Sequence, residues 1–342
     1  MGVPNTHQSG NPDVPADVLE ALSTARRPVV FGHVVPDADC LGSALALVKI
    51  LRAGGTDAVL GIPENCISKR LNFLLDFAPD APRRATLPER FDALIVVDTA
   101  SEKRVNFDNR PVFAEHPATL NIDHHVSNTR FCSINWIDAA ASSSCEMIAA
   151  IAFAGGQAIT SDTASLLYAG LIGDTAGFSL PTTTAHTLHI ASRLVEAGAN
   201  VSLVGERLCR SQSREDFDLL RRVYDHTTLT LGGRVSYSFL TYEDIVQSGC
   251  GPQDIDDQVA IPRALAGVRV ALLFSEGEPG VIRVNLRGEG ETSVLGIAQS
   301  FGGGGHSQSA GIRLKNRSMQ EAIDMVVAAT GAHLDGMRGM LE

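Results

Sequence analysis

The chain has 342 residues, of which 44% are hydrophobic and 20% are charged, which is the composition of an ordinary globular protein with roughly two domains. A formal net charge of −11 leaves no broad basic face, so long duplex nucleic acid is excluded as a partner, whereas a small anionic ligand is not. Charged residues or glycines interrupt the long apolar stretches, so we expect no transmembrane segment and a cytoplasmic protein. Six cysteines without a CxxC pair argue against a zinc knuckle or a disulfide scaffold.

The first part of the chain predicts an α/β domain. Residues 1–24 are expected to form a flexible leader, and residues 25–200 alternate short apolar strands with helices, as in a Rossmann-like parallel sheet. The expected strands are residues 28–31, 93–97 and 118–122. The expected helices are residues 41–53 and a helix through Ala154 that opens with the capping-box pattern of Ser143 and Glu146.

The second part of the chain predicts a smaller α+β domain over residues 219–342. A polar, charged segment over residues 201–218 is expected to link it to the first domain, as an extended linker or an exposed helix. Strand-like apolar runs then occur at 235–241, 268–274 and 281–286. A glycine-rich segment and a last helix from about Met319 complete the domain.

Acidic and histidine clusters follow the predicted strands. His33, Asp37 and Asp39 come after the first strand, Asp98 ends the second, and the triplet Asp123-His124-His125 follows the third. Asp174 interrupts an apolar, helix-like stretch. The carboxyl ends of parallel strands meet at one edge of a sheet, where ligands of open α/β folds bind. The sequence therefore predicts one site at this edge.

Each cluster also has a structural interpretation. Asp39 alone would cap a helix, with His33 as a loop histidine, Asp98 would cap a turn, and Asp174 would end a helix. If Asp37 and Asp39 occupy alternate positions of an extended segment, however, their charges lie side by side, which is costly without nearby cations.

Taken together, the clusters supply four carboxylates, two imidazoles and no thiolate. They come from the cluster of His33, Asp37 and Asp39, from Asp98, from the triplet Asp123-His124-His125 and from Asp174. Oxygen and nitrogen ligands of this kind suit two divalent cations, and manganese in particular. Paired cations about 3.5–4 Å apart activate water and neutralise phosphate oxygens, so the predicted reaction is phosphoester hydrolysis. Of the adjacent pair His124 and His125, one can be a metal ligand and its neighbour an acid that faces the phosphate, while Asp123 can orient an imidazole ring.

A second cluster lies downstream, where Gly302 to Gly305 precede His306. Glycines let backbone N–H groups approach an anion closely, although a flexible linker has the same composition. The segment is not a Walker loop, because no Lys-Ser/Thr pair follows it. Arg287 ends a predicted strand and could contact the same phosphate, or could form a surface ion pair.

These motifs, in this order, resemble the DHH superfamily of phosphoesterases with its DHH-associated C-terminal domain, over about residues 25–330. Within it the chain is most similar to the nanoRNases, which are bifunctional oligoribonucleases and pAp phosphatases. The resemblance implies that His33, Asp37 and Asp98 hold one manganese, and that Asp39, Asp98, His124 and Asp174 hold the other. It also implies that His125 faces the scissile phosphate and that the second domain grips the substrate's terminal phosphate or nucleotide across a cleft between the domains. The residues implied for this grip are Arg287, Gly303, Gly304, Gly305 and His306.

The expected activity is therefore hydrolysis of oligoribonucleotides of a few units, such as pApA, to mononucleotides, and of pAp to AMP. A cyclic di-AMP phosphodiesterase with the same metal site is the main alternative. A family II inorganic pyrophosphatase has similar metal motifs, but the glycine-rich segment with His306 disfavours it. A catalytically silent nucleotide-binding protein is a further alternative, and the sequence leaves open whether the chain is a monomer or a homodimer.

Overall fold

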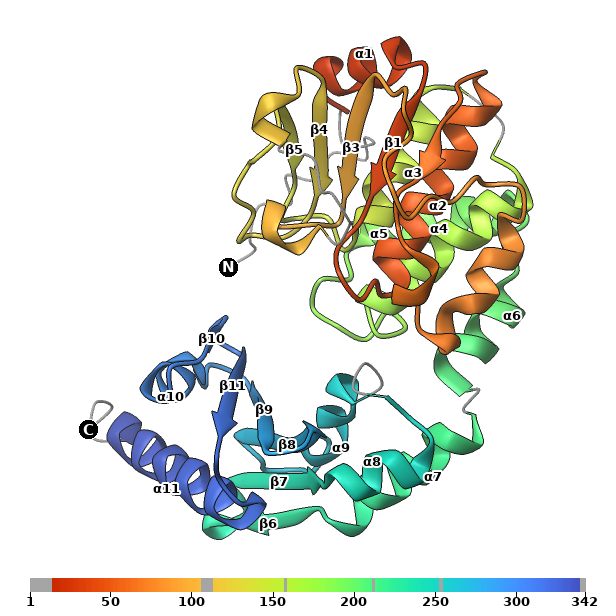
Figure 1. The fold of residues 1–342 in the computed structure, drawn as a ribbon. Helices are drawn as coiled ribbons and strands as arrows, with labels where there is room; N and C mark the ends of the chain where they lie inside the picture. The colour runs from red at the N-terminus through yellow and green to blue at the C-terminus, as the bar shows by residue number, and fades with distance from the viewer. Residues whose placement is uncertain (1–13, 106–112, 157–158, 211–212, 252–254, 339–342) are drawn as a thin grey trace, which may run out of the picture. The chain divides into compact units, whose positions relative to one another are not determined.

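A computed structural model describes residues 14–105, 113–156, 159–210, 213–251 and 255–338. The chain divides into two compact units, one up to Ser211 and the other from Gln212 (Figure 1). Among the described residues, no helix combines the length and the apolar character that crossing a membrane requires.

The first unit is built on five parallel strands in the order β2-β1-β3-β4-β5. The strands are β1 (Pro28–Phe31), β2 (Val59–Leu60), β3 (Ala93–Val97), β4 (Thr119–Asp123) and β5 (Ile134–Ile137). The main helices are α1 (Ala16–Thr24), α2 (Ala38–Ala53), α3 (Ser144–Ala154), α4 (Ser161–Asp174), α5 (Ala185–Glu196) and α6 (Val201–Gly205). Strands β1 and β3 are buried along their whole length, as parallel strands with both faces covered are. The predicted parallel α/β sheet is confirmed.

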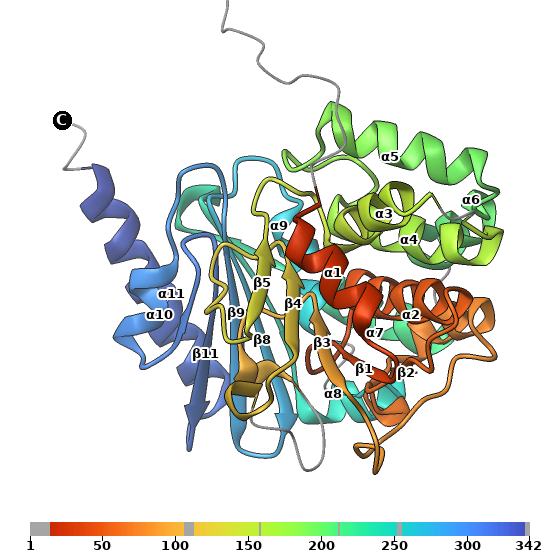
Figure 2. The same cartoon turned by 90° about the horizontal axis from the view of Figure 1, so that it is seen from above.

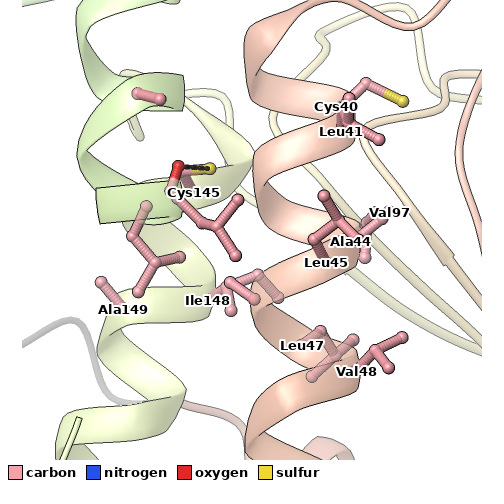
Figure 3. Packing of buried hydrophobic residues seen from close by; sticks show 14 of the residues in the cluster. Cys40, Leu41, Ala44, Leu45, Leu47, Val48, Val97, Cys145, Ile148 and Ala149 are labelled. Carbon is pink, nitrogen blue, oxygen red and sulfur yellow. Dashed lines mark hydrogen bonds between the residues drawn. The ribbon is translucent and has the colours of Figure 1, made fainter. Parts of the chain in front are cut away.

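Helices α2 to α5 lie on one side of this sheet (Figure 2). Figure 3 shows Leu45 and Leu47 of α2 beside Ile148 of α3, in the core between the helices. Glycines allow neighbouring helices of this layer, such as α2 and α4, to pack closely. A Cβ added to Gly42 of α2 would lie 2.6 Å from the carbonyl oxygen of Leu166 in α4.

Two predicted boundaries of the first unit differ from the structure. Helix α2 begins at Ala38, before the predicted residue 41, because the Asp37 side chain caps it by accepting the N–H groups of Asp39 and Cys40. The leader predicted over residues 1–24 is helical from Ala16 onward, so the prediction of a flexible segment was wrong for α1. Val18 and Leu22, four residues apart, are buried and hold α1 against the core. Residues 1–13 lie outside the described residues.

The second unit contains a six-stranded mixed sheet in the order β10-β11-β9-β8-β7-β6, in which only β7 and β8 pair in parallel. The strands are β6 (Thr228–Thr230), β7 (Val235–Leu240), β8 (Val270–Glu278), β9 (Val281–Gly288), β10 (Gly304–Gly305) and β11 (Ser309–Lys315). The main helices are α7 (Arg214–Asp225), α8 (Tyr242–Ser248), α9 (Ala260–Arg263), α10 (Leu295–Ser300) and α11 (Met319–Arg338). This is the predicted α+β arrangement.

The division between the units falls inside the segment predicted as a linker, residues 201–218. Its described residues are largely helical, because α6 and a π-helical turn over Glu206–Arg210 precede the division and α7 follows it. Asn200 and Ser213 cap the two α-helices with their side chains. Val204 of α6 and Leu219 of α7 are fully buried, each in the core of its own unit.

Replacement of Gly170 by alanine tests the close packing in the first unit. A Cβ there would lie 2.2 Å from Cys145 Sγ and 2.6 Å from Asp39 Oδ1, so we expect Gly170→Ala to lower the free energy of unfolding by about 1–3 kcal/mol. Urea unfolding followed by the fluorescence of Trp136, the single tryptophan, reports on this unit. Gly155→Ala is the control, because its Cβ would come no closer than 3.5 Å to another atom. Equal unfolding midpoints for the two variants would contradict the prediction.

Candidate functional site

The predicted metal-binding residues lie at the carboxyl edge of the parallel sheet and at adjoining helix ends. His33 follows β1, Asp98 follows β3, and His124 follows β4. Asp39 lies in the first turn of α2 and Asp174 is the last residue of α4. Residues from five segments therefore converge on one point of the first unit.

Asp98 lies between two groups of side chains. Its Oδ2 atom is 3.4 Å from His33 Nε2, and its Oδ1 atom is 3.5 Å from His124 Nε2. On the first side, Asp37 Oδ2 lies 3.7 Å from His33 Nε2. On the second side, His124 Nε2 lies 3.1 Å from Asp174 Oδ2 and 4.0 Å from Asp39 Oδ2. The six predicted ligands thus form two groups that share Asp98.

One expectation about this cluster was wrong. Asp37 and Asp39 are not alternate residues of an extended segment, because Asp37 is the N-cap of α2 and Asp39 is already helical. The Asp37 side chain is 59% exposed, whereas that of Asp39 is fully buried. The structural interpretation also named the wrong residue, since the helix is capped by Asp37 and not by Asp39.

The N-terminus of α3 holds the buried carboxylates in place. The backbone N–H of Ser144 donates to Asp39 Oδ2 at 2.7 Å, and that of Cys145 donates to Asp39 Oδ1 at 2.8 Å. The Ser144 hydroxyl donates to Asp98 Oδ1 at 3.1 Å. A helix N-terminus is a favourable place for a carboxylate, because its free N–H groups and its dipole both attract negative charge. The capping-box pattern of Ser143 and Glu146 marked this helix start in the sequence, and the Ser143 side chain accepts the Glu146 N–H, but the sequence did not indicate the contact with Asp39 and Asp98.

Burial and crowding of like charges shift the pKa values of the carboxyl groups. Burial raises the pKa of Asp39, and the carboxylates of Asp98 and Asp174 raise it further. Burial also raises the pKa of Asp174, to about 6. Burial by itself would raise the pKa of Asp98 too, but the imidazoles of His124 and His33 outweigh it and hold the pKa below its usual range. The cluster therefore requires positive charge close to Asp98.

Burial and charge act on the pKa values of His124 and His33 in the opposite sense to their action on the carboxyl groups. Burial by itself lowers the pKa of His124, but the carboxylates of Asp174 and Asp98 outweigh it and raise the pKa to about 12. The His33 pKa is likewise raised against its burial, by Cys40, Asp37 and Asp98 together. A divalent cation supplies the same positive charge with two neutral imidazoles as ligands, and its binding releases the protons.

The arrangement of donor atoms fits divalent cations. His33 Nδ1 lies 2.8 Å from the carbonyl oxygen of Val34, so Nε2 is the atom directed at Asp37 and Asp98. Within the described part of the chain, the buried Nε2 atom of His124 has no hydrogen-bond partner, although three carboxylates surround it. Ligand atoms of Asp39, His124 and Asp174 lie within 4.8 Å of one another. Carboxylate and imidazole donors at this spacing are those that manganese and magnesium sites use.

His125 belongs to a neighbouring hydrogen-bond network. Its Nδ1 atom lies 2.7 Å from Oδ1 of Asp123, which is fully buried. This hydrogen bond is the largest cause of the raised pKa of His125. The His125 side chain is 37% exposed, so its ring reaches solvent, while the buried Asp123 carboxylate holds its Nδ1 atom. Asp123 thus contacts one of the two rings that the sequence predicted it could orient.

The glycine-rich segment of the second unit forms the short strand β10, next to β11. Arg287 of β9 pairs with Ser309 of β11, and the backbone N–H of His306 donates to the carbonyl oxygen of Ser309 at 2.7 Å. Arg287 and His306 are therefore both adjacent to Ser309. Two glycines are required by the backbone, because a Cβ on Gly303 would lie 2.2 Å from the carbonyl oxygen of Gly311, and Gly305 has a φ of 143°. A Cβ on Gly304 would meet nothing within 4 Å.

Known proteins with similar sequences cover nearly the whole chain. The bifunctional oligoribonuclease and PAP phosphatase NrnA of Thermus thermophilus is 28% identical over 323 residues, which are 93% of this chain and 93% of that protein. The cyclic-di-AMP phosphodiesterase PdeA of Listeria monocytogenes is 25% identical over 339 residues, which are 93% of this chain and 49% of that protein.

Solved structures show the same fold. An exopolyphosphatase-related protein from Bacteroides fragilis matches with a TM-score of 0.83 at 22% identity, over 95% of this chain and 96% of that chain. RecJ from Thermus thermophilus in complex with Mn²⁺ matches with a TM-score of 0.54 at 17% identity, over 93% of this chain and 53% of that chain.

Two family profiles match the two units. The N-terminal domain of the DHH family matches residues 27–171, which include the predicted metal ligands from His33 to His124, and the DHHA1 domain matches residues 232–331, which include Arg287 and the glycine-rich segment. The order of the two domains is the one that the sequence motifs predicted. The chain belongs to the DHH family, with a DHH N-terminal domain followed by a DHHA1 domain.

Proposed function

We propose that this DHH-family phosphoesterase uses two divalent cations, with manganese the best suited, to hydrolyse short oligoribonucleotides such as pApA to mononucleotides and pAp to AMP. The observation that carries the proposal is the pair of histidine and carboxylate groups that share Asp98. The relative from Thermus thermophilus, named for both activities, supports the choice of substrates. A net charge of −11 also favours short substrates over long nucleic acid.

The residues of the cluster have distinct roles in this proposal. His33, Asp37 and Asp98 would hold one cation, and Asp39, Asp98, His124 and Asp174 the other. When bound, such cations supply Lewis-acid charge for the phosphate oxygens and lower the pKa of water. The backbone N–H groups of Ser144 and Cys145 hold Asp39 in the orientation it needs. Asp98 acts in catalysis as the carboxylate common to both groups.

His125 has the role of a catalytic acid. Because Asp123 holds its Nδ1 atom, the Nε2 atom is the one left to face the scissile phosphate. A protonated ring at that position stabilises the phosphate charge and donates a proton to the departing oxygen. The raised pKa of His125 keeps the ring protonated at higher pH than a free histidine.

The second unit contributes substrate recognition. Arg287, Gly303, Gly304, Gly305 and His306 would bind the terminal phosphate or nucleotide of the substrate. A guanidinium suits this task because it forms two parallel hydrogen bonds with phosphate oxygens. Gly304 in particular leaves open space above the backbone, which a bound phosphate can enter.

Hydrolysis of cyclic di-AMP is the second candidate function. The relative named for that activity aligns with 93% of this chain, as does the oligoribonuclease. The same metal-binding residues serve linear and cyclic phosphodiesters equally, because both reactions displace a ribose oxygen from a diester. Only substrate preference separates the two candidates.

A panel of three substrates tests the proposed function directly. With Mn²⁺ present we expect release of AMP from pApA and from pAp, and complete loss of both activities on chelation. Product formation is measured by liquid chromatography, with cyclic di-AMP as the third substrate. A higher kcat/KM for cyclic di-AMP would move the chain to the second candidate. No turnover of any of the three substrates would favour the alternative of a catalytically silent nucleotide-binding protein.

Metal binding is tested independently of turnover. We expect Mn²⁺ at 100 times the Kd of each site to stabilise the first unit by about 2.7 kcal/mol per site, as measured by calorimetric unfolding. Asp98→Asn should remove most of this stabilisation, because it neutralises the carboxylate that both groups share. Asp162→Asn is the matched control, since Asp162 lies in the first turn of α4, the helix that ends at Asp174. An undiminished Mn²⁺ effect in Asp98→Asn would overturn the assignment.

Alanine substitutions at Gly304 and Gly303 distinguish an effect on substrate binding from an effect on stability. We expect Gly304→Ala to raise KM for pApA about tenfold, equivalent to about 1.4 kcal/mol, without a change in melting temperature. Gly303→Ala should instead lower the melting temperature, because its Cβ would collide with the Gly311 carbonyl oxygen. Steady-state kinetics and calorimetry of both variants provide the comparison. An unchanged KM in Gly304→Ala would remove this glycine from the substrate site.

A further inference from the structure

Asn128 connects three neighbours of the candidate site. Its side-chain nitrogen Nδ2 donates to Asp123 Oδ2 at 2.6 Å and to Asn121 Oδ1 at 2.7 Å. The nearest Nδ2 contact after these is the carbonyl oxygen of Thr99, at 3.2 Å. An amide nitrogen carries two hydrogens, so the two shortest bonds use both.

The direction of the Asn128 amide is fixed from both ends. Its Oδ1 atom accepts the backbone N–H of Arg130 at 2.7 Å, so the nitrogen must face Asp123. Asn121 is held in turn, because its own Nδ2 donates to the carbonyl oxygens of Val96 and Thr99 at 3.2 and 3.4 Å. The two asparagines therefore form a fixed bridge from the end of β3 to Asp123.

Each oxygen of the Asp123 carboxylate has a different partner. Oδ1 lies 2.7 Å from His125 Nδ1, and Oδ2 accepts from Asn128. Asp123 is fully buried, so water cannot replace a lost donor at low cost. Two partners on two oxygens fix the plane of the carboxylate and, through it, the plane of the imidazole ring.

We propose that Asn128 is a positioning residue for the reaction, which acts on His125 through the Asp123 carboxylate. The inference rests on the proposed function, in which His125 donates a proton to the departing oxygen. Without the Asn128 donor, Asp123 Oδ2 loses its short hydrogen bond, the hydrogen bond to His125 alone no longer fixes the carboxylate plane, and His125 loses its orientation. The metal ligands keep their places, since none of the hydrogen bonds described for Asn128 involves them.

Leaving-group dependence tests this role. In Asn128→Ala we expect kcat for pApA, whose leaving ribose oxygen needs a proton, to fall about 100-fold with little change in KM. The kcat for bis-p-nitrophenyl phosphate, whose leaving group departs as a stable anion, should stay within about twofold of wild type. Asn135→Ala is the matched control, because the described hydrogen bonds of the Asn135 side chain are with the Cys132 backbone and the substitution keeps the backbone pairing of Asn135 with Asn121, so it should leave both rates unchanged. Equal losses on the two substrates would overturn the proposal.

A double-mutant cycle and a measurement without substrate complete the test. If Asn128 acts through Asp123, Asn128→Ala should add little to the loss caused by Asp123→Ala, whereas multiplied losses would contradict this route. In proton NMR, the downfield Nδ1–H signal of His125 should broaden or vanish in Asn128→Ala and persist in Asn135→Ala. A wild-type protein inactive on both substrates would refute the proposed function, and the NMR comparison would then confirm or overturn the positioning role on its own.

Discussion

The buried negative charge of Asp39 and Asp98 is the constraint on which the first unit depends. Two carboxylates in a protein interior are strongly unfavourable unless each has donors and nearby positive charge. The fold supplies the donors by directing the N-terminus of α3 at Asp39 and the Ser144 hydroxyl at Asp98. It supplies positive charge through His33 and His124. The need for positive charge at this site follows from burial of the acids, before any substrate is considered, and in the proposed function divalent cations would supply it.

Several residues around the site also have an unfavourable backbone conformation. Val35, Asp98, Ala176 and Phe178 all have positive φ angles, between 47° and 66°, which cost L-residues on the order of 1 kcal/mol each. Val35 lies between His33 and Asp37, and Ala176 and Phe178 follow Asp174 closely. Strained conformations persist only where the surrounding structure enforces them, and they cluster at functional sites. Here the buried sheet and the packing of α2 against α4 provide that enforcement.

The sequence was most informative where a function requires a local pattern. Strands β1 and β3 and the residues that follow them were predicted because an apolar run that ends in an acid or a histidine is a local signal. The contact between Ser144 and Asp39 could not be predicted, since 105 residues separate them and only the packing of α3 beside α2 brings them together. Helix α1 was missed because Pro15 offers no side-chain cap to mark its start. The sequence also could not distinguish Gly304 from Gly303. Whether an added Cβ meets open space or a backbone carbonyl oxygen depends on the three-dimensional structure.

Substrate choice must come from residues outside the metal cluster. The relatives named for linear oligoribonucleotides and for cyclic di-AMP both align with 93% of this chain, at similar identities of 28% and 25%. Two cations held by carboxylates and imidazoles recognise a phosphodiester and carry no information about its ends. The features that distinguish a free terminal phosphate from a ring are an anion-binding guanidinium and a backbone that a phosphate can approach. Under the proposed function, Arg287 of β9 and Gly304 of β10, two strands that both pair with β11, would provide these features, so we expect selection between the two substrate classes to depend on the DHHA1 domain.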